Sequence, residues 1–175
     1  MKFDVVIGNP PYQELTTQNM GSGQAPVQNI FQYFQELADV LSTDYTTLIY
    51  PGKRWIHQSG KGMAKFGYNQ INDRHLAKLI YFEDANEVFS AVSIPDGISI
   101  VVKDYHKASD SFIYEFYGKD GRHKILKDAK YPGANIFVMD PDDLPIATKI
   151  DEVVQKNQFK YIHDSPAINR QLFKI

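Results

Sequence analysis

The sequence predicts an α/β protein with an open sheet, and two apolar runs with a helical stretch between them carry this prediction. Residues 3–8 (FDVVIG) and 46–50 (TTLIY) are rich in Val and Ile and stop at Pro or Gly, as buried strands do. Residues 29–42 carry apolar side chains at the spacing of one helical face. A strand, a helix and a strand in this order form the right-handed crossover unit of a parallel sheet.

The tetrapeptide Asn9-Pro10-Pro11-Tyr12 follows the first strand directly. Open α/β sheets bind their ligands at the carboxyl ends of strands, so this position suits a site. A tight turn after the strand is the alternative. Residues 3–13 (FDVVIGNPPYQ) closely resemble the catalytic motif of the amino-methyltransferases, and most of all that of the adenine-N6 DNA methyltransferases of restriction-modification systems.

The resemblance gives these four residues a chemical role. The exocyclic amine of adenine is a poor nucleophile, because its lone pair is delocalised into the ring. The Asn9 side-chain oxygen and the Pro10 carbonyl can accept its two N–H bonds and turn the lone pair towards a methyl donor. Pro11 lacks an N–H and fixes the direction of the Pro10 carbonyl. The ring of Tyr12 can stack on a flipped-out base.

Composition restricts the chemistry further. The 175 residues are 43% hydrophobic and 13% aromatic, which suits one domain or a domain and a half with a core. Cysteine is absent, which excludes disulfides, thiolate metal sites and the thiol adduct needed for carbon-5 cytosine methylation. The histidines lack metal-ligand spacing, so we expect no metal. A net charge of −2 gives no global support to DNA binding. Without an apolar span or a leader pattern, we expect a cytoplasmic location.

The stretches beside the second strand complete the expected site. Residues 14–28 are a long loop, either a disordered excursion or a lid; the resemblance favours the lid. Residues 52–62 (GKRWIHQSGKG) are the most basic stretch and follow the second strand. They are either simply solvated or in contact with DNA phosphates. The expected phosphate contacts are Lys53, Arg54, Lys61 and Lys65.

In the helical stretch we expect the apolar face to cover the sheet. Its members are Ile30, Phe34, Leu37, Ala38 and Leu41. A second, short helix is expected at 63–74, weakened by Gly67. Residues 76–82 and 98–102 are expected strands joined through a turn at 93–97. In the resembling enzymes such a pair lies at the far edge of the sheet, and an aromatic residue before the turn packs on the base opposite the Tyr. Phe89 corresponds to it; the alternative is a core Phe at a strand end.

Beyond residue 104 the sequence predicts a hairpin, with strands at 112–117 and 122–126 around an Asp-Gly turn. A short strand at 136–139 and an amphipathic helix bearing Ile146, Ile150, Val153 and Val154 are expected to follow.

The resemblance implies a partial Rossmann-like methyltransferase sheet, its second half with an edge hairpin, followed by a small α+β segment. It covers residues 1–104; residues 105–175 would be a connector and the start of a target-recognition region. No Gly-rich loop follows a strand as the S-adenosylmethionine site of these enzymes requires. We therefore expect a fragment of a larger protein that is inactive alone, with S-adenosylmethionine as the cofactor of the whole.

The expected partners are double-stranded DNA and, fused or separate, a restriction endonuclease. Methyltransferases with this motif that act on RNA or on a protein glutamine remain an alternative. So does a non-catalytic nucleic-acid-binding remnant.

Overall fold

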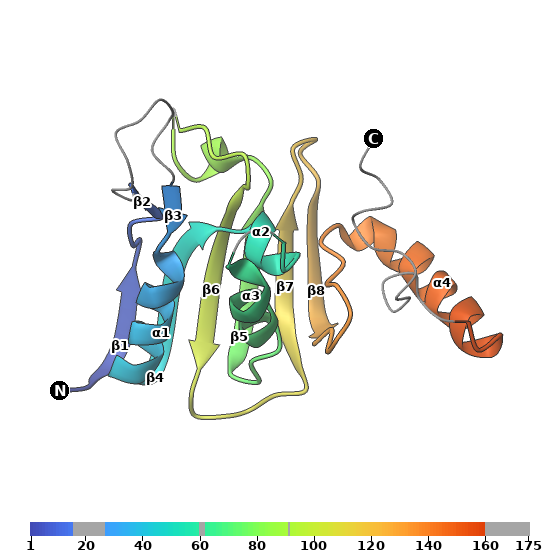
Figure 1. Cartoon of the computed structure of the whole chain (residues 1–175), viewed down its shortest axis with the longest axis horizontal. Coiled ribbons are helices and arrows are strands. Elements are labelled where there is room, and N and C mark those ends of the chain that lie inside the picture. Colours follow the sequence, from blue (N-terminus) through green and yellow to red (C-terminus); the bar gives the residue numbers. More distant parts are fainter. Residues whose placement is uncertain (16–26, 60–61, 91, 160–175) are drawn as a thin grey trace, which may run out of the picture. The chain divides into compact units, whose positions relative to one another are not determined.

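The computed structural model describes residues 1–15, 27–59, 62–90 and 92–159. It divides into two compact units, Met1–Met139 and Asp140–Ile175. The first unit contains a six-stranded sheet in the order β1-β4-β6-β5-β7-β8 (Figure 1). Its strands are β1 (Phe3–Gly8), β4 (Ser42–Pro51), β6 (Ile98–Asp104), β5 (Leu76–Phe82), β7 (Ser111–Tyr117) and β8 (His123–Lys130). β1 pairs with β4 and β5 with β7 in parallel, and the remaining pairs are antiparallel. The predicted α/β class is confirmed.

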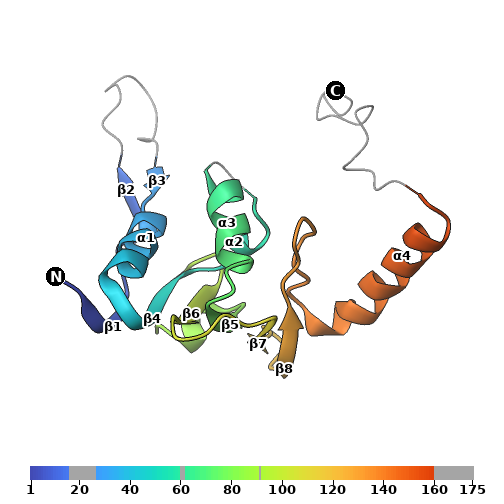
Figure 2. The same cartoon turned by 90° about the horizontal axis from the view of Figure 1, so that it is seen from below.

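Three helices lie on one face of this sheet: α1 (Phe31–Leu41), α2 (Lys53–Ile56) and α3 (Met63–Ile71) (Figure 2). α1 connects β1 to β4, as predicted. The segment expected to be a loop at 14–28 forms strands at its two ends. These strands, β2 (Gln13–Leu15) and β3 (Val27–Asn29), pair antiparallel. The lid prediction concerns mainly residues 16–26, which lie outside the described residues.

α2 and α3 pack closely, and a glycine makes this possible. A Cβ on Gly67 would lie 2.0 Å from the backbone oxygen of Trp55. The Trp55 side chain is fully buried, and its indole N–H donates to Ser99 Oγ at 3.1 Å. Gly67, expected only to weaken the helix, therefore has a packing role.

The face that α1 turns to the sheet differs from the prediction. Ala38 is buried as expected, but Phe34 and Leu37 are 38% and 53% exposed. Phe31, Gln35 and Ala38 face the core instead, at the i, i+4, i+7 spacing. The prediction assigned only apolar residues to the buried face of the helix. Gln35 is nevertheless buried, because it has hydrogen-bond partners inside the protein.

Two further strand predictions were wrong in position or kind. The strand pair expected at the far edge of the sheet is formed by β5 and β6. It lies inside the sheet, because β7 pairs with the other side of β5. Residues 136–139 form no strand; Phe137 and Met139 are buried there, and the Met139 carbonyl accepts a hydrogen bond from Tyr114. The hairpin of β7 and β8 is confirmed, with Gly121 at a φ of 81°. The expected boundary after residue 104 falls within the sheet, whereas the compact units divide after Met139.

The second unit has a short 3₁₀ turn, η2 (Pro141–Asp143), and the predicted amphipathic helix, α4 (Leu144–Lys156). α4 has no buried residue, and Ile146, Ile150 and Val153 are at least half exposed. No helix in the described part of the chain is long and apolar enough to cross a membrane.

Candidate active site

The carboxyl ends of three strands meet at one edge of the sheet. β1 runs parallel to β4, and β4 and β5 both run antiparallel to β6, so β1, β4 and β5 share one direction. The segments after them are residues 9–12, 52–54 and 83–97. The structure therefore gathers the motif, the start of the basic stretch and the segment of Phe89 at this edge.

Asn9 and its neighbours are accessible there. Asn9 and Pro11 are exposed and Pro10 is half-buried. Within the described residues the Asn9 side chain has no hydrogen-bond partner, so its oxygen is free to accept from a ligand. Gly8 packs on Leu48, with a Cβ at that position 3.4 Å from the Leu48 side chain, which sets the end of β1 against β4.

Tyr12 is fixed in place by core packing and by a backbone hydrogen bond. Its ring packs against the hydrophobic core and is half-buried. Its hydroxyl is buried and has no hydrogen-bond partner among the described residues, and this burial raises the pKa of Tyr12. Its carbonyl accepts from Ile30 N–H at 3.1 Å, which ties the motif to the start of α1. Its stacking role stays a prediction.

Phe89 follows η1 (Ala85–Glu87) and is half-buried. Its N–H donates to the carbonyl of Ala85 at 2.9 Å, and Ala85 is 2% exposed, so the turn is anchored. Between β1 and β5 stand β4 and β6, which separates these strands by about 14 Å at about 4.8 Å per strand. Tyr12 and Phe89 can sandwich a base only if both lean across this gap, and the Phe89 assignment also stays a prediction.

The predicted phosphate contacts have different surroundings. Lys53 is exposed and has no acidic partner among the described residues. Arg54 Nε lies 2.9 Å from Asp96 Oδ2, and Lys53 N–H donates to the Asp96 carbonyl at 2.9 Å. Burial and the charge of Lys53 lower the pKa of His57, which favours its neutral form. Lys53 is thus the freer cation at the strand edge, while Arg54 is engaged in holding the 93–97 turn.

The other two lysines are placed differently. Lys65 is exposed on α3 and lines a cleft between α1 and α3. Lys61 lies outside the described residues.

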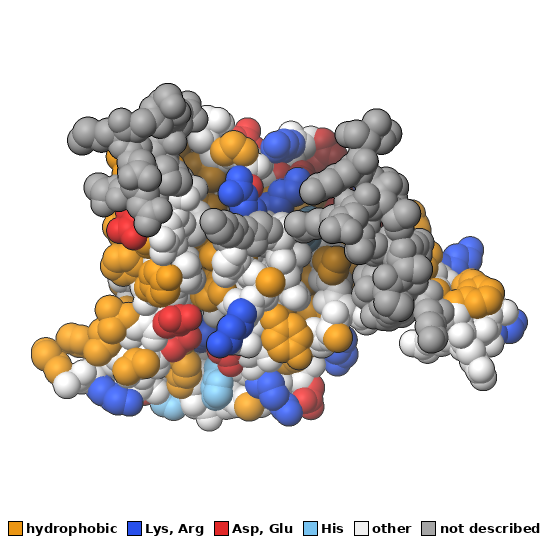
Figure 3. Space-filling view, viewed as in Figure 1, with side chains coloured by type: hydrophobic (Ala, Val, Ile, Leu, Met, Phe, Trp, Pro, Cys, Tyr) orange, Lys and Arg blue, Asp and Glu red, His pale blue; other side chains and the backbone are white. Residues whose placement is uncertain are grey.

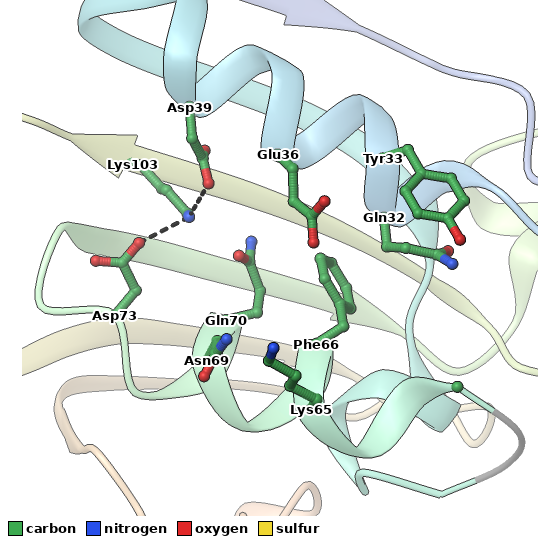
Figure 4. A pocket seen from close by; sticks show the side chains of 11 residues that line it. Gln32, Tyr33, Glu36, Asp39, Lys65, Phe66, Asn69, Gln70, Asp73 and Lys103 are labelled. Atoms are coloured by element: carbon green, nitrogen blue, oxygen red, sulfur yellow. Dashed lines mark hydrogen bonds and ion pairs between the residues drawn. The ribbon is translucent and has the colours of Figure 1, made fainter.

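That cleft has a volume of about 320 Å³ and holds polar residues that sequence reasoning missed (Figure 4). The Lys103 side chain is 2% exposed, and its Nζ lies 2.8 Å from Asp39 Oδ2 and 2.7 Å from Asp73 Oδ2. Lys103 lies in β6, one residue beyond the strand expected at 98–102. The alternation of β6 could have located it, since Ser99, Val101 and Lys103 all point to the helix-covered face.

The network continues inside the protein. Gln35 donates to Asp39 Oδ1 at 2.6 Å and accepts from Tyr50 OH at 3.1 Å, and Gln70 donates to Tyr50 OH at 2.9 Å. Burial raises the pKa of Tyr50 well above its usual value. The polar atoms of these side chains hydrogen-bond to one another, and the network links α1, α3 and β6. We therefore assign it no reactive atom. Among the described residues, no three His, Asp or Glu side chains gather as a metal site requires.

Comparison with known proteins agrees with the motif. The sequence model of the Eco57I restriction-modification methylase family matches residues 1–89. An uncharacterized adenine-specific methylase of Mycoplasma pneumoniae is 28% identical over 138 residues, which are 79% of this chain and 31% of the relative. The chain therefore spans about a third of that relative's length.

Solved structures were also compared. The crystal structure of the M protein of the type I restriction enzyme EcoKI is similar with a TM-score of 0.46 and 13% identity, over 67% of this chain and 26% of that one. The methyltransferase subunit of a type I restriction-modification system from Streptococcus thermophilus gives a TM-score of 0.47 and 13% identity, over 86% and 32%. The family match includes β1, the whole NPPY motif and Phe89 within residues 1–89, more than half of the chain. The chain therefore belongs to the Eco57I restriction-modification methylase family.

Proposed function

We propose that this chain acts in a restriction-modification enzyme that methylates the N6 amine of an adenine flipped out of double-stranded DNA. One observation carries the proposal: Asn9, within the NPPY motif, is exposed at the carboxyl end of β1 with its side-chain oxygen unpaired among the described residues. Family membership and the relative described as adenine-specific support the reaction class.

The chain's own residues orient the amine. Asn9 Oδ1 and the Pro10 carbonyl accept hydrogen bonds from the two N–H groups of the adenine amine. These bonds favour a tetrahedral nitrogen with its lone pair directed out of the ring plane. Pro11 holds the Pro10 carbonyl in place through its fixed φ. Tyr12 and Phe89 stack on the two faces of the base, and Lys53 contacts a neighbouring phosphate. Asn at the first motif position favours adenine over cytosine, for which Ser is more usual in resembling enzymes.

S-adenosylmethionine supplies the methyl group in such enzymes, and we tested whether the described residues could hold it. The groove at Asn9 has a volume of about 210 Å³, and apart from Asn9 it is lined by apolar residues of β1, α1 and β4 and by Pro10, with no carboxylate among them. The ribose hydroxyls and the ammonium group of the cofactor need several hydrogen-bond acceptors, whereas the only polar side chain that lines this groove is Asn9, whose oxygen we assign to the adenine. The groove alone does not fit the cofactor, and we assign no cofactor-binding residue in this chain.

Substitution of Asn9 tests the proposal. In the natural protein that contains these residues, Asn9→Ala should lower methyl transfer from labelled S-adenosylmethionine to DNA by about 10²- to 10³-fold, the usual cost of losing one such acceptor or donor. Asn135→Ala, an exposed asparagine outside the motif, is the matched control and should keep full activity. Near-normal transfer by Asn9→Ala would contradict the assignment.

The same assay separates the substrate classes. Duplex DNA, RNA and a glutamine-containing protein are offered in parallel, and the proposal requires transfer to DNA at N6 of adenine. A calorimetric titration of the 175-residue chain with S-adenosylmethionine addresses the cofactor separately. Tight binding there would contradict our conclusion that the groove beside Asn9 does not fit it.

A further inference from the structure

The end of the NPPY motif is held by the start of α1. Ile30 lies directly before this helix, and its N–H donates to the Tyr12 carbonyl at 3.1 Å. The start of the motif is held by the pairing of β1 with β4. We expected β1 to be a buried strand, but Val5 and Ile7 are 51% and 75% exposed. The geometry of the motif therefore depends on what fixes the start of α1.

Phe31, the first residue of α1, is well placed to fix this start. Among the described residues that follow the motif, it is the first that is buried, with 3% of its surface exposed. Its ring stacks on the ring of Tyr50, with the centroids 4.9 Å apart and 18° between the planes. It also contacts the ring of Phe66 edge-on, at a centroid distance of 5.8 Å. Such aromatic pairs stabilise beyond the area that they bury, so Phe31 has a defined position.

Tyr50 is a firm support at the level of the motif. It is fully buried near the end of β4, and Gly8 pairs with Leu48, two residues earlier in this strand. Its hydroxyl donates to Gln35 Oε1 at 3.1 Å and accepts from Gln70 Nε2 at 2.9 Å. The ring is therefore tied to α1 and to α3 as well as to the sheet.

The other contacts beside the end of the motif are weaker. β2 and β3 pair over three residues each, and every residue of β2 is exposed. The side-chain hydrogen bond from Gln13 to Asn29 Oδ1 is exposed too. A two-stranded pair is only marginally stable in water, so this one cannot set the geometry of the motif by itself. The Tyr12 ring packs against the core, and the cluster that it contacts includes Phe31 and Tyr50.

We propose that Phe31 is a positioning residue for methyl transfer. Its stack on Tyr50 fixes the start of α1, and the Ile30 N–H transmits this position to the Tyr12 carbonyl and so to the two acceptors of the adenine amine. The inference rests on the proposed function, in which the DNA lies at the edge of the sheet. Figure 3 shows Lys and Arg side chains gathered at this edge, near the end of β4.

Phe31→Leu tests the proposal in the natural protein that contains these residues. The variant loses the ring and keeps an apolar side chain. Because a displacement of about 1 Å can slow a reaction by about 100-fold, kcat for transfer to duplex DNA should fall by about 10- to 100-fold. KM for DNA should stay within about twofold, since the motif acts on the amine in the transition state. Phe31→Met, which fills the space without a ring, is a second variant with the same expected result.

Phe112→Leu is the matched control. Phe112 is 2% exposed, packs among aromatic rings and lies near the amino end of β7, at the opposite edge of the sheet from the motif. It loses the same ring from the same core, so its kcat should be unchanged. Both variants are assayed well below their melting temperatures, which circular dichroism measures.

Hydrogen exchange of the 175-residue chain measures the contact without catalysis. The Ile30 amide should exchange about 10-fold faster in Phe31→Leu than in the wild type, because local opening of the start of α1 exposes it. Phe112→Leu should leave this rate unchanged.

Three results would overturn the proposal. The first is an unchanged kcat in Phe31→Leu, and the second is an equal loss in Phe112→Leu, which would reflect core stability alone. The third is a lower kcat with unchanged exchange at Ile30, which would exclude the path through Tyr12. An active Asn9→Ala enzyme would instead contradict the proposed function, whereas exchange at Ile30 needs no activity, so the two failures are distinguishable.

Discussion

Replacing Lys103 with methionine should reveal how much the buried ion network stabilises the first unit. Methionine keeps the length of the side chain and removes its charge. The variant leaves Asp39 and Asp73 as two carboxylates without the cation between them. Losing one partner of a buried pair costs about 3–5 kcal/mol, because the remaining charge is left uncompensated.

The exposure of the carboxylates sets where in that range the cost falls. The Asp39 and Asp73 side chains are 31% and 24% exposed, so water can hydrate both after the substitution. We therefore expect the lower end, about 3 kcal/mol, which corresponds to a fall of roughly 6–12 °C in Tm for a protein of this size. Against a total stability of about 5–15 kcal/mol, this is a large fraction.

The cost should also depend on pH. Burial alone would raise the pKa of Asp73, but the charge and hydrogen bond of Lys103, together with hydrogen bonds from His75, outweigh it and hold the pKa below its ordinary value. A lowered carboxyl pKa contributes stability above the unfolded pKa of about 4, and this contribution is lost as pH falls through the folded pKa. The difference between wild type and Lys103→Met should therefore shrink below about pH 4.

Urea unfolding followed by tryptophan fluorescence measures this. Trp55 is the single tryptophan and is fully buried in the first unit. Lys130→Met, at an exposed position on β8, is the matched control and should change stability by less than about 0.5 kcal/mol. A loss below about 1 kcal/mol for Lys103→Met, or a loss of the same size at pH 7 and pH 3, would refute the reasoning.

Three further substitutions test the packing of Gly67 and the buried hydroxyl of Tyr12. Gly67→Ala would place a Cβ 2.0 Å from the Trp55 backbone oxygen and should cost about 3 kcal/mol or more in urea unfolding. Gly121→Ala has open space, and its positive φ alone should cost about 1 kcal/mol; equal losses would contradict the packing argument. Tyr12→Phe removes a buried hydroxyl with no partner among the described residues and should stabilise by about 1 kcal/mol. A destabilised Tyr12→Phe would mean that this hydroxyl has a partner.

Local pattern was enough to predict the order of the elements and the position of the motif. Short apolar runs located β1, β4, β5 and β7 to within a few residues, and all but β5 stop at Pro or Gly, because strand formation and chain reversal depend on neighbouring residues. The NPPY motif falls at the carboxyl end of β1 for the same reason. Family membership could also be inferred from the sequence, since the motif and its preceding strand are contiguous.

Pairing across the sheet could not be predicted in this way. β6 lies between β4 and β5, and β7 extends the sheet beyond β5, so the expected edge pair is internal. The order of strands depends on contacts between residues far apart in sequence. No local pattern contains that information.

The sequence by itself determined the α/β class, the motif and the family, because each of these depends on residues that are contiguous in the chain. Only the tertiary structure decided which side chains are buried. Lys103 and Gln35 are buried because partners from other elements satisfy their polar atoms, and the apolar side chains of β1 are exposed because no other element of the described chain covers them. The free energy of burying a residue depends on what surrounds it, and the surroundings are assembled only when the chain has folded.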